Sequence, residues 1–179
     1  MAAEQAFHIW EGVYGEWNEA LPVGDAFNND KWLGEQAAHV GAEFADRDNL
    51  FFHSEMPPAD MRFDIVHVGR SMQYVDDWRG LLAAFVQRKE QYIALAGLLA
   101  GDIKPFVTMQ NYYGCKIPVR FLNRDEVIRA VEDLGYRLIY KALHFSKRLG
   151  REGPLPMENF PAENRLEHPC QLLFQKKSA

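Results

Sequence analysis

A short polar stretch that follows an apolar run carries residues that could do chemistry. The run "FDIVHVG" (63–69) is followed at once by "RSMQYVDDW", which contains Gln73, Tyr74 and two adjacent carboxylates, Asp76 and Asp77. A carboxylate within hydrogen-bond reach can act as a general base toward a hydroxyl or an amine. Asp is also a preferred N-cap residue, and a helical pattern follows here. Both roles are open on the sequence, and for Asp76 helix capping is favoured.

A second stretch, "TMQNYYGCKIPVRF" (108–121), is dense in aromatic and hydrogen-bonding side chains. Such a surface suits a sugar or another polyhydroxylated acceptor, with tyrosine rings against C–H patches and amides on hydroxyls. The alternative is a loop that packs its tyrosines on the core and holds its arginine in a salt bridge. The candidate substrate-binding residues are Gln110, Asn111, Tyr112, Tyr113 and Arg120.

The histidines and cysteines give weaker signals. His67 lies inside the apolar run and is typical of a core histidine, whereas His53 ends a short aromatic run at 49–53. No histidine pair has the spacing of a zinc site, so we predict no metal. Cys115 and Cys170 are far apart in sequence, and we expect free thiols.

Periodicity and turn signals predict the elements that must position these residues. Apolar runs without helical spacing indicate strands, and the last two of them suggest an antiparallel pair at the edge of the sheet. Because buried strands alternate with helices, the sequence predicts an α/β domain with a largely parallel sheet. The expected helices are 34–46, 77–88 and 124–134, and the expected strands are 49–53, 63–69, 91–98, 136–145 and 170–177.

The clearest local signal is "NRDEVIRAVEDLGY". Asn123 is expected to cap a helix, with Glu126 reaching back as in a capping box. Gly135 supplies the left-handed residue that commonly ends a helix. The sequence therefore predicts both ends of this helix.

Composition limits the class of protein. The 179 residues suit one domain, and a net charge of -5 gives no indication of nucleic-acid binding. The longest uncharged run, "QYIALAGLLAG", is far shorter than the ~20 apolar residues of a membrane span. Without a signal-peptide pattern at the N-terminus, we expect a cytoplasmic protein.

The N-terminal residues 1–33 form a weakly periodic extension rich in aromatics, before a domain at 34–179. Trp10, Tyr14 and Trp17 could form a lid over a pocket, but aromatics in a terminal segment more often form a hydrophobic clasp.

Several motifs, in order along the chain, resemble a family of S-adenosylmethionine-dependent methyltransferases that often occur in bacterial gene clusters for surface polysaccharides. The resemblance implies a Rossmann-like (class I) sheet in which 63–69 is the fourth strand and 91–98 the fifth. It also implies that the C-terminal strand pair is antiparallel. The motifs are "IWEGVYGEWNEA", "FDIVHVGRSMQYVDDW", "PFVTMQNYYGCKIPVRFLNRDEV", "LGY", "GPLPMENFPAENR" and "CQLLFQ".

One expected part is missing from the sequence. Methyltransferases of this fold place a glycine-rich turn after the first strand and an acidic residue after the second, by the same physical logic as dinucleotide folds. Gly34 and Gly41 are isolated in a helical context, and no G-x-G follows a strand. We therefore expect a truncated methyltransferase-like domain that lacks the first two strands.

The resemblance implies roles for individual residues. Gln73 and Asp77 would be catalytic, and Tyr74, Ser71 and His53 would contact the cofactor S-adenosylmethionine. The five residues of the stretch 108–121 would hold a small or sugar-like acceptor. The alternative is a binding or partner module that has lost the donor, as a homodimer that covers an exposed sheet edge.

Overall fold

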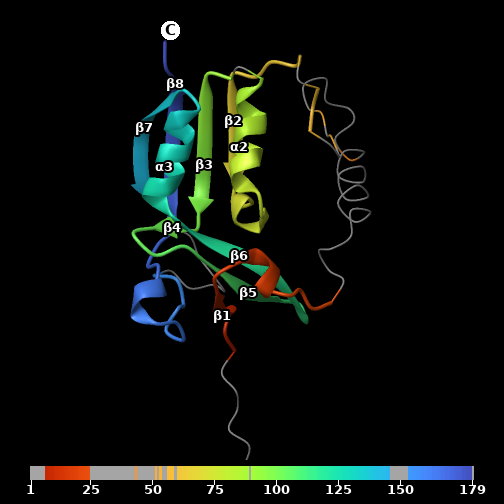
Figure 1. The fold of residues 1–179 in the computed structure, drawn as a ribbon, viewed down its shortest axis with the longest axis vertical. Coiled ribbons are helices and arrows are strands. Elements are labelled where there is room, and N and C mark those ends of the chain that lie inside the picture. The colour runs from red at the N-terminus through yellow and green to blue at the C-terminus, as the bar shows by residue number, and fades with distance from the viewer. Residues whose placement is uncertain are drawn as a thin grey trace, which may run out of the picture.

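The computed structural model describes residues 7–24, 43, 51, 53, 56–58, 60–88, 90–145 and 153–178. Two four-stranded sheets dominate this part of the chain (Figure 1). The first sheet has the order β1-β5-β6-β4 and the second the order β2-β3-β8-β7. The strands are β1 (Trp10–Tyr14), β2 (Ile65–Gly69), β3 (Tyr92–Leu98), β4 (Ala100–Gly101), β5 (Phe106–Tyr112), β6 (Cys115–Asn123), β7 (Tyr136–Leu143) and β8 (Cys170–Lys176).

The predicted fold class, a mostly parallel Rossmann-like sheet that lacks its first two strands, is wrong for this structure. The pairs β2–β3 and β4–β6 are parallel, while β1–β5, β5–β6, β3–β8 and β7–β8 are antiparallel. The described chain therefore forms two mixed sheets in which antiparallel pairs predominate. The predicted helix 34–46 and most of the predicted strand 49–53 lie outside the described residues.

The difference arises mainly from 106–123, which includes the stretch 108–121 that we expected to be a binding loop. This segment is a hairpin in which Tyr112 pairs with Cys115 across a two-residue turn. Tyr113 and Gly114 both have positive φ angles, 45° and 82°, as a type I′ turn requires. Along β6 the buried side chains Ile117, Val119 and Phe121 alternate with less buried ones, so the pleat directs one face into a core.

Four strands and two helices that the sequence predicts are present within a few residues of the predicted ends. The predicted strands 63–69 and 91–98 appear as the parallel pair β2–β3, and the C-terminal runs appear as the antiparallel pair β7–β8. Helices α2 (Trp78–Val86) and α3 (Arg124–Asp133) cover one face of the second sheet (Figure 1).

At α3 the predicted cap Asn123 is confirmed but the predicted capping box is not, because the Glu126 carboxylate accepts from Arg79 instead; at α2 the predicted cap is wrong. Asn123 accepts hydrogen bonds from the backbone N–H groups of Asp125 and Glu126, at 3.1 and 3.0 Å. Gly135, after α3, has a φ of +93°. The cap of α2 is Asp77 rather than Asp76, because the Asp77 carboxylate accepts from the Gly80 N–H at 2.8 Å.

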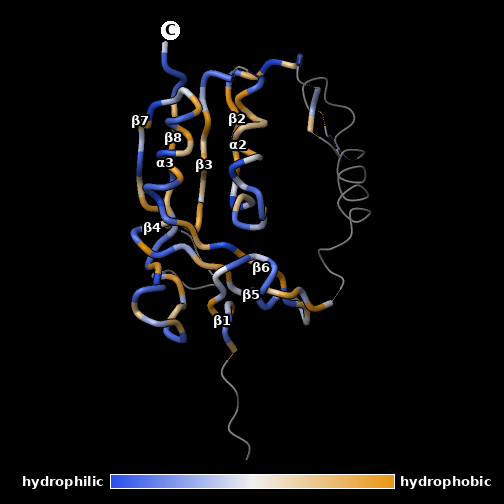
Figure 2. The backbone as a smooth tube through the Cα atoms, in the orientation of Figure 1, coloured by the Kyte–Doolittle hydropathy of each residue, from blue (hydrophilic) through white to orange (hydrophobic). Residues whose placement is uncertain are grey.

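The core of the second sheet lies between its strands and the two helices. Leu82 of α2 and Val127 and Val131 of α3 are fully buried against β3 and β8. Figure 2 shows hydrophobic residues concentrated along β3, which is an interior strand of this sheet. Within the described chain, no helix has the length and apolar character needed to cross a membrane.

The chain continues directly from one sheet to the other. β3 ends at Leu98 and, after Leu99, β4 pairs with β6 in the first sheet. As a result, the carboxyl ends of the parallel strands β2 and β3 point toward the first sheet (Figure 1). In sheets with parallel strands, ligands usually bind at the carboxyl ends, so the boundary between the two sheets is the natural place for a site.

The two cysteines are free thiols in different environments. Cys170 is 2% exposed, and burial raises the pKa of its thiol to about 11, so it is protonated at neutral pH. Because the thiolate is the reactive form, we expect a maleimide to label Cys115 in the native protein and Cys170 only after unfolding. Mass spectrometry of labelled native and denatured protein tests this; equal labelling rates in native protein would contradict the burial of Cys170.

Candidate active site

The turn after β2 buries Met72 and Gln73 and leaves most of its other side chains exposed. It runs from Arg70 through the short 3₁₀ helix η2 (Met72–Tyr74) to Asp77. Gln73 is 5% exposed, and its amide Nε2 donates to the Arg70 carbonyl at 2.7 Å. Its other polar atom, Oε1, is buried and has no hydrogen-bond partner in the described part of the chain. An unpaired buried acceptor is costly, so this atom is a candidate ligand contact.

Two side-chain contacts join this turn to the hairpin β5–β6. The Tyr74 hydroxyl donates to Gln110 Oε1 at 3.0 Å, and Arg120 Nη2 donates to Asp76 Oδ1 at 2.8 Å. The helix η2 also packs against β6. The predicted catalytic turn and part of the predicted acceptor stretch therefore meet; we call these residues, together with Gln73, the junction.

The N-terminal segment that follows β1 also contacts the junction, through Trp17. The Arg120 guanidinium lies 5.3 Å from the ring centroid of Trp17, which is a cation–π distance. Its Nε is buried without a hydrogen-bond partner among the described residues. Trp10 is 1% exposed and packs edge-on against Phe121. Burial of Trp10 agrees with a clasp rather than a lid.

The two carboxylates of the turn have different environments. Asp76 is ion-paired with Arg120, whereas Asp77 accepts from a backbone N–H as the cap of α2. A carboxylate offers about four lone-pair directions, so the cap leaves Asp77 able to accept a further proton or hydrogen bond. Asp77 is therefore the better placed of the two to act as a base.

The other predicted site residues lie apart from the junction contacts. The Asn111 side chain donates to the His8 carbonyl at 2.8 Å and so anchors the N-terminal segment. Tyr112 and Tyr113 contact each other edge-to-face at the hairpin turn, beside a shallow groove of about 460 Å³. Ser71, at the start of η2, and His53 are exposed.

The same groove contains an ion pair that supports the N-terminal strand. Lys116 Nζ lies 2.7 Å from Glu11 Oε2. The ion pair therefore links β6 to β1 across β5, the strand that lies between them. Hydrogen bonds from Lys116 and then Asn111 hold the pKa of Glu11 below its usual value. A lowered folded-state pKa stabilises the folded protein above the ordinary glutamate range, and that contribution is lost as the pH falls.

Four residues at the carboxyl edge of the second sheet were not singled out from the sequence. Arg70 Nη2 lies 2.7 Å from His144 Nε2, and the Gln171 amide lies 3.1 Å from His144 Nδ1. Gly97 lies beneath the Arg70 side chain. We call Arg70, Gly97, His144 and Gln171 the carboxyl-edge cluster. The isolated glycine in a strand pattern was the one available signal, since it indicates close approach of another group.

The described residues do not form a metal centre. They contain no group of three His, Cys, Asp or Glu side chains that could hold a metal ion. The residues that follow β2 include a buried amide acceptor, Gln73 Oε1, and the hydroxyl of Tyr74. Such groups suit an organic ligand that carries hydrogen-bond donors.

The fold itself is similar to that of an S-adenosylmethionine-dependent methyltransferase. A solved structure of such an enzyme from Clostridium acetobutylicum ATCC 824 matches with a TM-score of 0.50 and 9% sequence identity. The match covers 83% of this chain and 72% of that one. No protein-family model and no curated protein matches the sequence. At this identity the likeness concerns the fold alone, and it supports the methyltransferase resemblance at that level.

Proposed function

We propose that this protein binds S-adenosylmethionine at the junction and transfers its methyl group to a small or sugar-like acceptor. The observation that carries the proposal is the Tyr74–Gln110 hydrogen bond, which joins the turn after β2 to the hairpin. Candidate donor-side and acceptor-side residues thereby share one surface where parallel strands end. The fold likeness to a methyltransferase supports the same assignment.

The residues present fit such a donor in one specific respect. The buried Gln73 Oε1 is an acceptor without a partner in the described chain, and an amino or hydroxyl group of the ligand would satisfy it. Tyr74 is partly exposed and can cover the adenosyl group. When bound, S-adenosylmethionine supplies a methyl group on a sulfonium for in-line displacement.

The chain's own contribution is then alignment and proton removal. Gln110 and Arg120 orient the acceptor from the hairpin, and alignment of this kind supplies much of the rate of a two-substrate reaction. Asp77 takes the proton of an acceptor hydroxyl, because Asp76 is neutralised by Arg120. In this proposal Ser71, His53, Asn111 and the hairpin tyrosines contact the two substrates from outside the junction.

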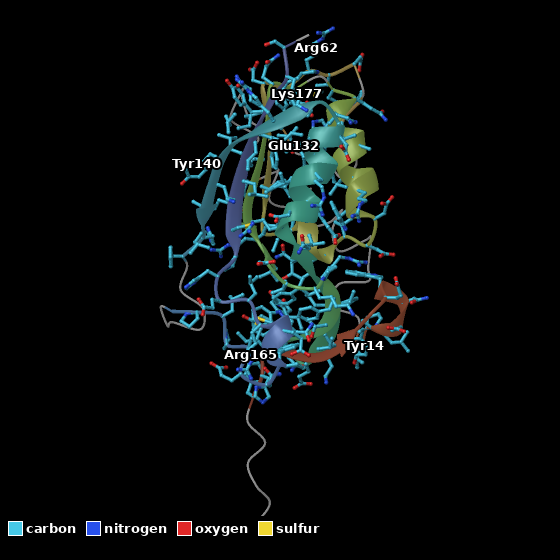
Figure 3. All side chains as sticks on the ribbon, turned by 60° about the vertical axis from the view of Figure 1, so that its left-hand side comes forward. Tyr14, Arg62, Glu132, Tyr140, Arg165 and Lys177 are labelled. Atoms are coloured by element: carbon cyan, nitrogen blue, oxygen red, sulfur yellow. The ribbon has the colours of Figure 1, made fainter. Side chains whose placement is uncertain are left out.

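Calorimetric titration of the purified chain with S-adenosylmethionine and S-adenosylhomocysteine tests the proposal. We expect micromolar binding that Gln73→Ala or Tyr74→Ala weakens by about tenfold, or 1.4 kcal/mol. Tyr140→Ala is the matched control, because Tyr140 is about as exposed as Tyr74 but lies on β7 at the outer side of the second sheet (Figure 3). Absence of heat and of a thermal shift at millimolar ligand, with folded protein, would exclude donor binding.

A second candidate is a binding or partner module without methyl transfer. It is favoured by the structural use of both carboxylates, one in an ion pair and one in a cap. Among the described strands β2 pairs only with β3, and Ile65 at its start is 52% exposed. A homodimer that covers this edge would then form. Sedimentation of the chain without ligand gives its oligomeric state, and the calorimetric titration above gives donor binding. A chain that is a monomer and binds S-adenosylmethionine would exclude this second candidate.

A further inference from the structure

The carboxyl-edge cluster begins with a strained residue. Arg70 has a φ of 52°, in the left-handed region that few residues other than glycine adopt. Its N–H donates to the Ala96 carbonyl at 2.9 Å, and its carbonyl accepts from Gln73 Nε2. These bonds hold the strained conformation in place and set the direction of the side chain. Strain of this kind is concentrated at functional positions.

A glycine in the neighbouring strand makes room for that side chain. Gly97 has a φ of +61°, and a Cβ there would lie 2.7 Å from Arg70 Cγ and 3.4 Å from His144 Nε2. The arginine stem therefore crosses β3 at the one position without a side chain. Its guanidinium reaches His144, which follows β7 on the far side of β8.

Contacts at both ring nitrogens position the His144 side chain. A guanidinium only donates, so His144 Nε2 must accept from Arg70 through its lone pair. On its other side, Nδ1 lies 3.1 Å from the Gln171 side-chain amide. The two contacts fix the orientation of the imidazole beside the Arg70 guanidinium.

The charge of Arg70 is not balanced by a carboxylate in the described part of the chain. Its described partners are His144 and backbone groups. Arg79, Arg120 and Arg124 each pair with an acidic side chain, and Arg88, Arg137 and Arg165 donate to carbonyl oxygens. Arg70 is exposed, and one of its five N–H donors is used by His144. The rest of its planar fork matches two oxygens of one anionic group.

We propose that the carboxyl-edge cluster binds a carboxylate or phosphate group of a small molecule. Arg70 would hold two oxygens of the group, while His144 and Gly97 fix the direction of the guanidinium. The anion site stands on the geometry alone. Its assignment to the acceptor, which would make the acceptor an acidic sugar-like molecule, rests on the proposed function, since Arg70 begins the turn that carries Gln73 and Tyr74 of the junction.

The test is an NMR titration without S-adenosylmethionine, in which the side-chain signals of Arg70 Nε and the His144 imidazole are followed. The probes are inorganic phosphate, glucuronate and, as a neutral control, glucose, at constant ionic strength. We expect saturable shifts of both signals with at least one anion and none with glucose. Saturation by a single anion supports the site and identifies its chemistry.

Variants distinguish a specific anion site at Arg70 from nonspecific attraction to positive surface charge. Arg70→Ala should weaken binding by about tenfold or more, and Arg70→Lys should also weaken it because an ammonium lacks the fork. Arg62→Ala is the matched control: Arg62 is an exposed arginine before β2, at the end of the molecule away from Tyr14 (Figure 3). Circular dichroism checks that each variant is folded.

Two results would overturn the inference. One is a shift that does not saturate with either anion, and the other is an equal loss of affinity in Arg70→Ala and Arg62→Ala. The outcome is separable from that of the proposed function. Anion binding without donor binding leaves this site standing, whereas donor binding without anion binding removes this site alone.

Discussion

Replacement of Phe121 by alanine is expected to lower the free energy of unfolding by about 3–5 kcal/mol. Phe121 is fully buried in β6. Its ring stacks on Phe106 at 4.9 Å between centroids and meets Trp10 edge-on at 5.4 Å. The substitution removes these contacts and leaves a cavity among β1, β5 and β6, which cannot collapse without displacing strands.

Urea denaturation followed by circular dichroism measures this effect. Tyr113→Ala is the control in the same hairpin, because Tyr113 is 91% exposed and its loss should change stability by no more than about 0.5 kcal/mol. Similar effects of the two substitutions would contradict the burial of Phe121 and indicate that 106–123 is a surface loop. The comparison therefore tests the largest departure from the sequence-based prediction.

Gly97→Ala is expected to destabilise the protein by about 1–3 kcal/mol and to break the contact between Arg70 and His144. The new methyl group would require a left-handed conformation for alanine, and it would overlap the Arg70 stem at 2.7 Å. Urea denaturation measures the loss of stability. The NMR signal of the His144 imidazole reports the loss of the contact, because the guanidinium must leave Nε2.

Gly114→Ala separates the two causes. Gly114 has a φ of +82°, but no atom lies within 4 Å of the position that a Cβ would take. This control therefore carries backbone strain without a clash, and it should leave the His144 signal unchanged. If Gly97→Ala left that signal unchanged as well, Gly97 would not be positioning Arg70.

The sequence correctly predicted the helices and strands that are determined by residues close to them in the chain. Asn123 and Gly135 determine the ends of α3 through hydrogen bonding and a left-handed residue, and both act within a few residues. The apolar runs of β2 and β3 indicated buried strands, because both are flanked by segments that break the pattern. The predicted cap of α2 was wrong by one residue: Asp77 caps the helix, and Asp76 pairs with Arg120 on a distant strand.

Distant pairing explains what the sequence did not reveal. β1 pairs with β5 although nearly a hundred residues separate them, and nothing near Trp10 indicates that partner. The polar residues of 108–121 suggested a loop, but β5 begins with four buried residues and β6 alternates buried with less buried ones. The Tyr113–Gly114 pair was the missed turn signal. Tyr74 and Gln110 were each selected as site residues from the sequence, whereas the contact between them required the fold.

The position of β8 has a consequence for how the protein is made. β8 lies between β3 and β7 in the second sheet, although it follows both in the chain. Until β8 has been synthesised, each of those strands lacks its antiparallel partner. Non-local pairing of this kind slows folding and leaves strand edges open to aggregation in the meantime. The newly synthesised chain is therefore expected to depend on chaperones at this stage.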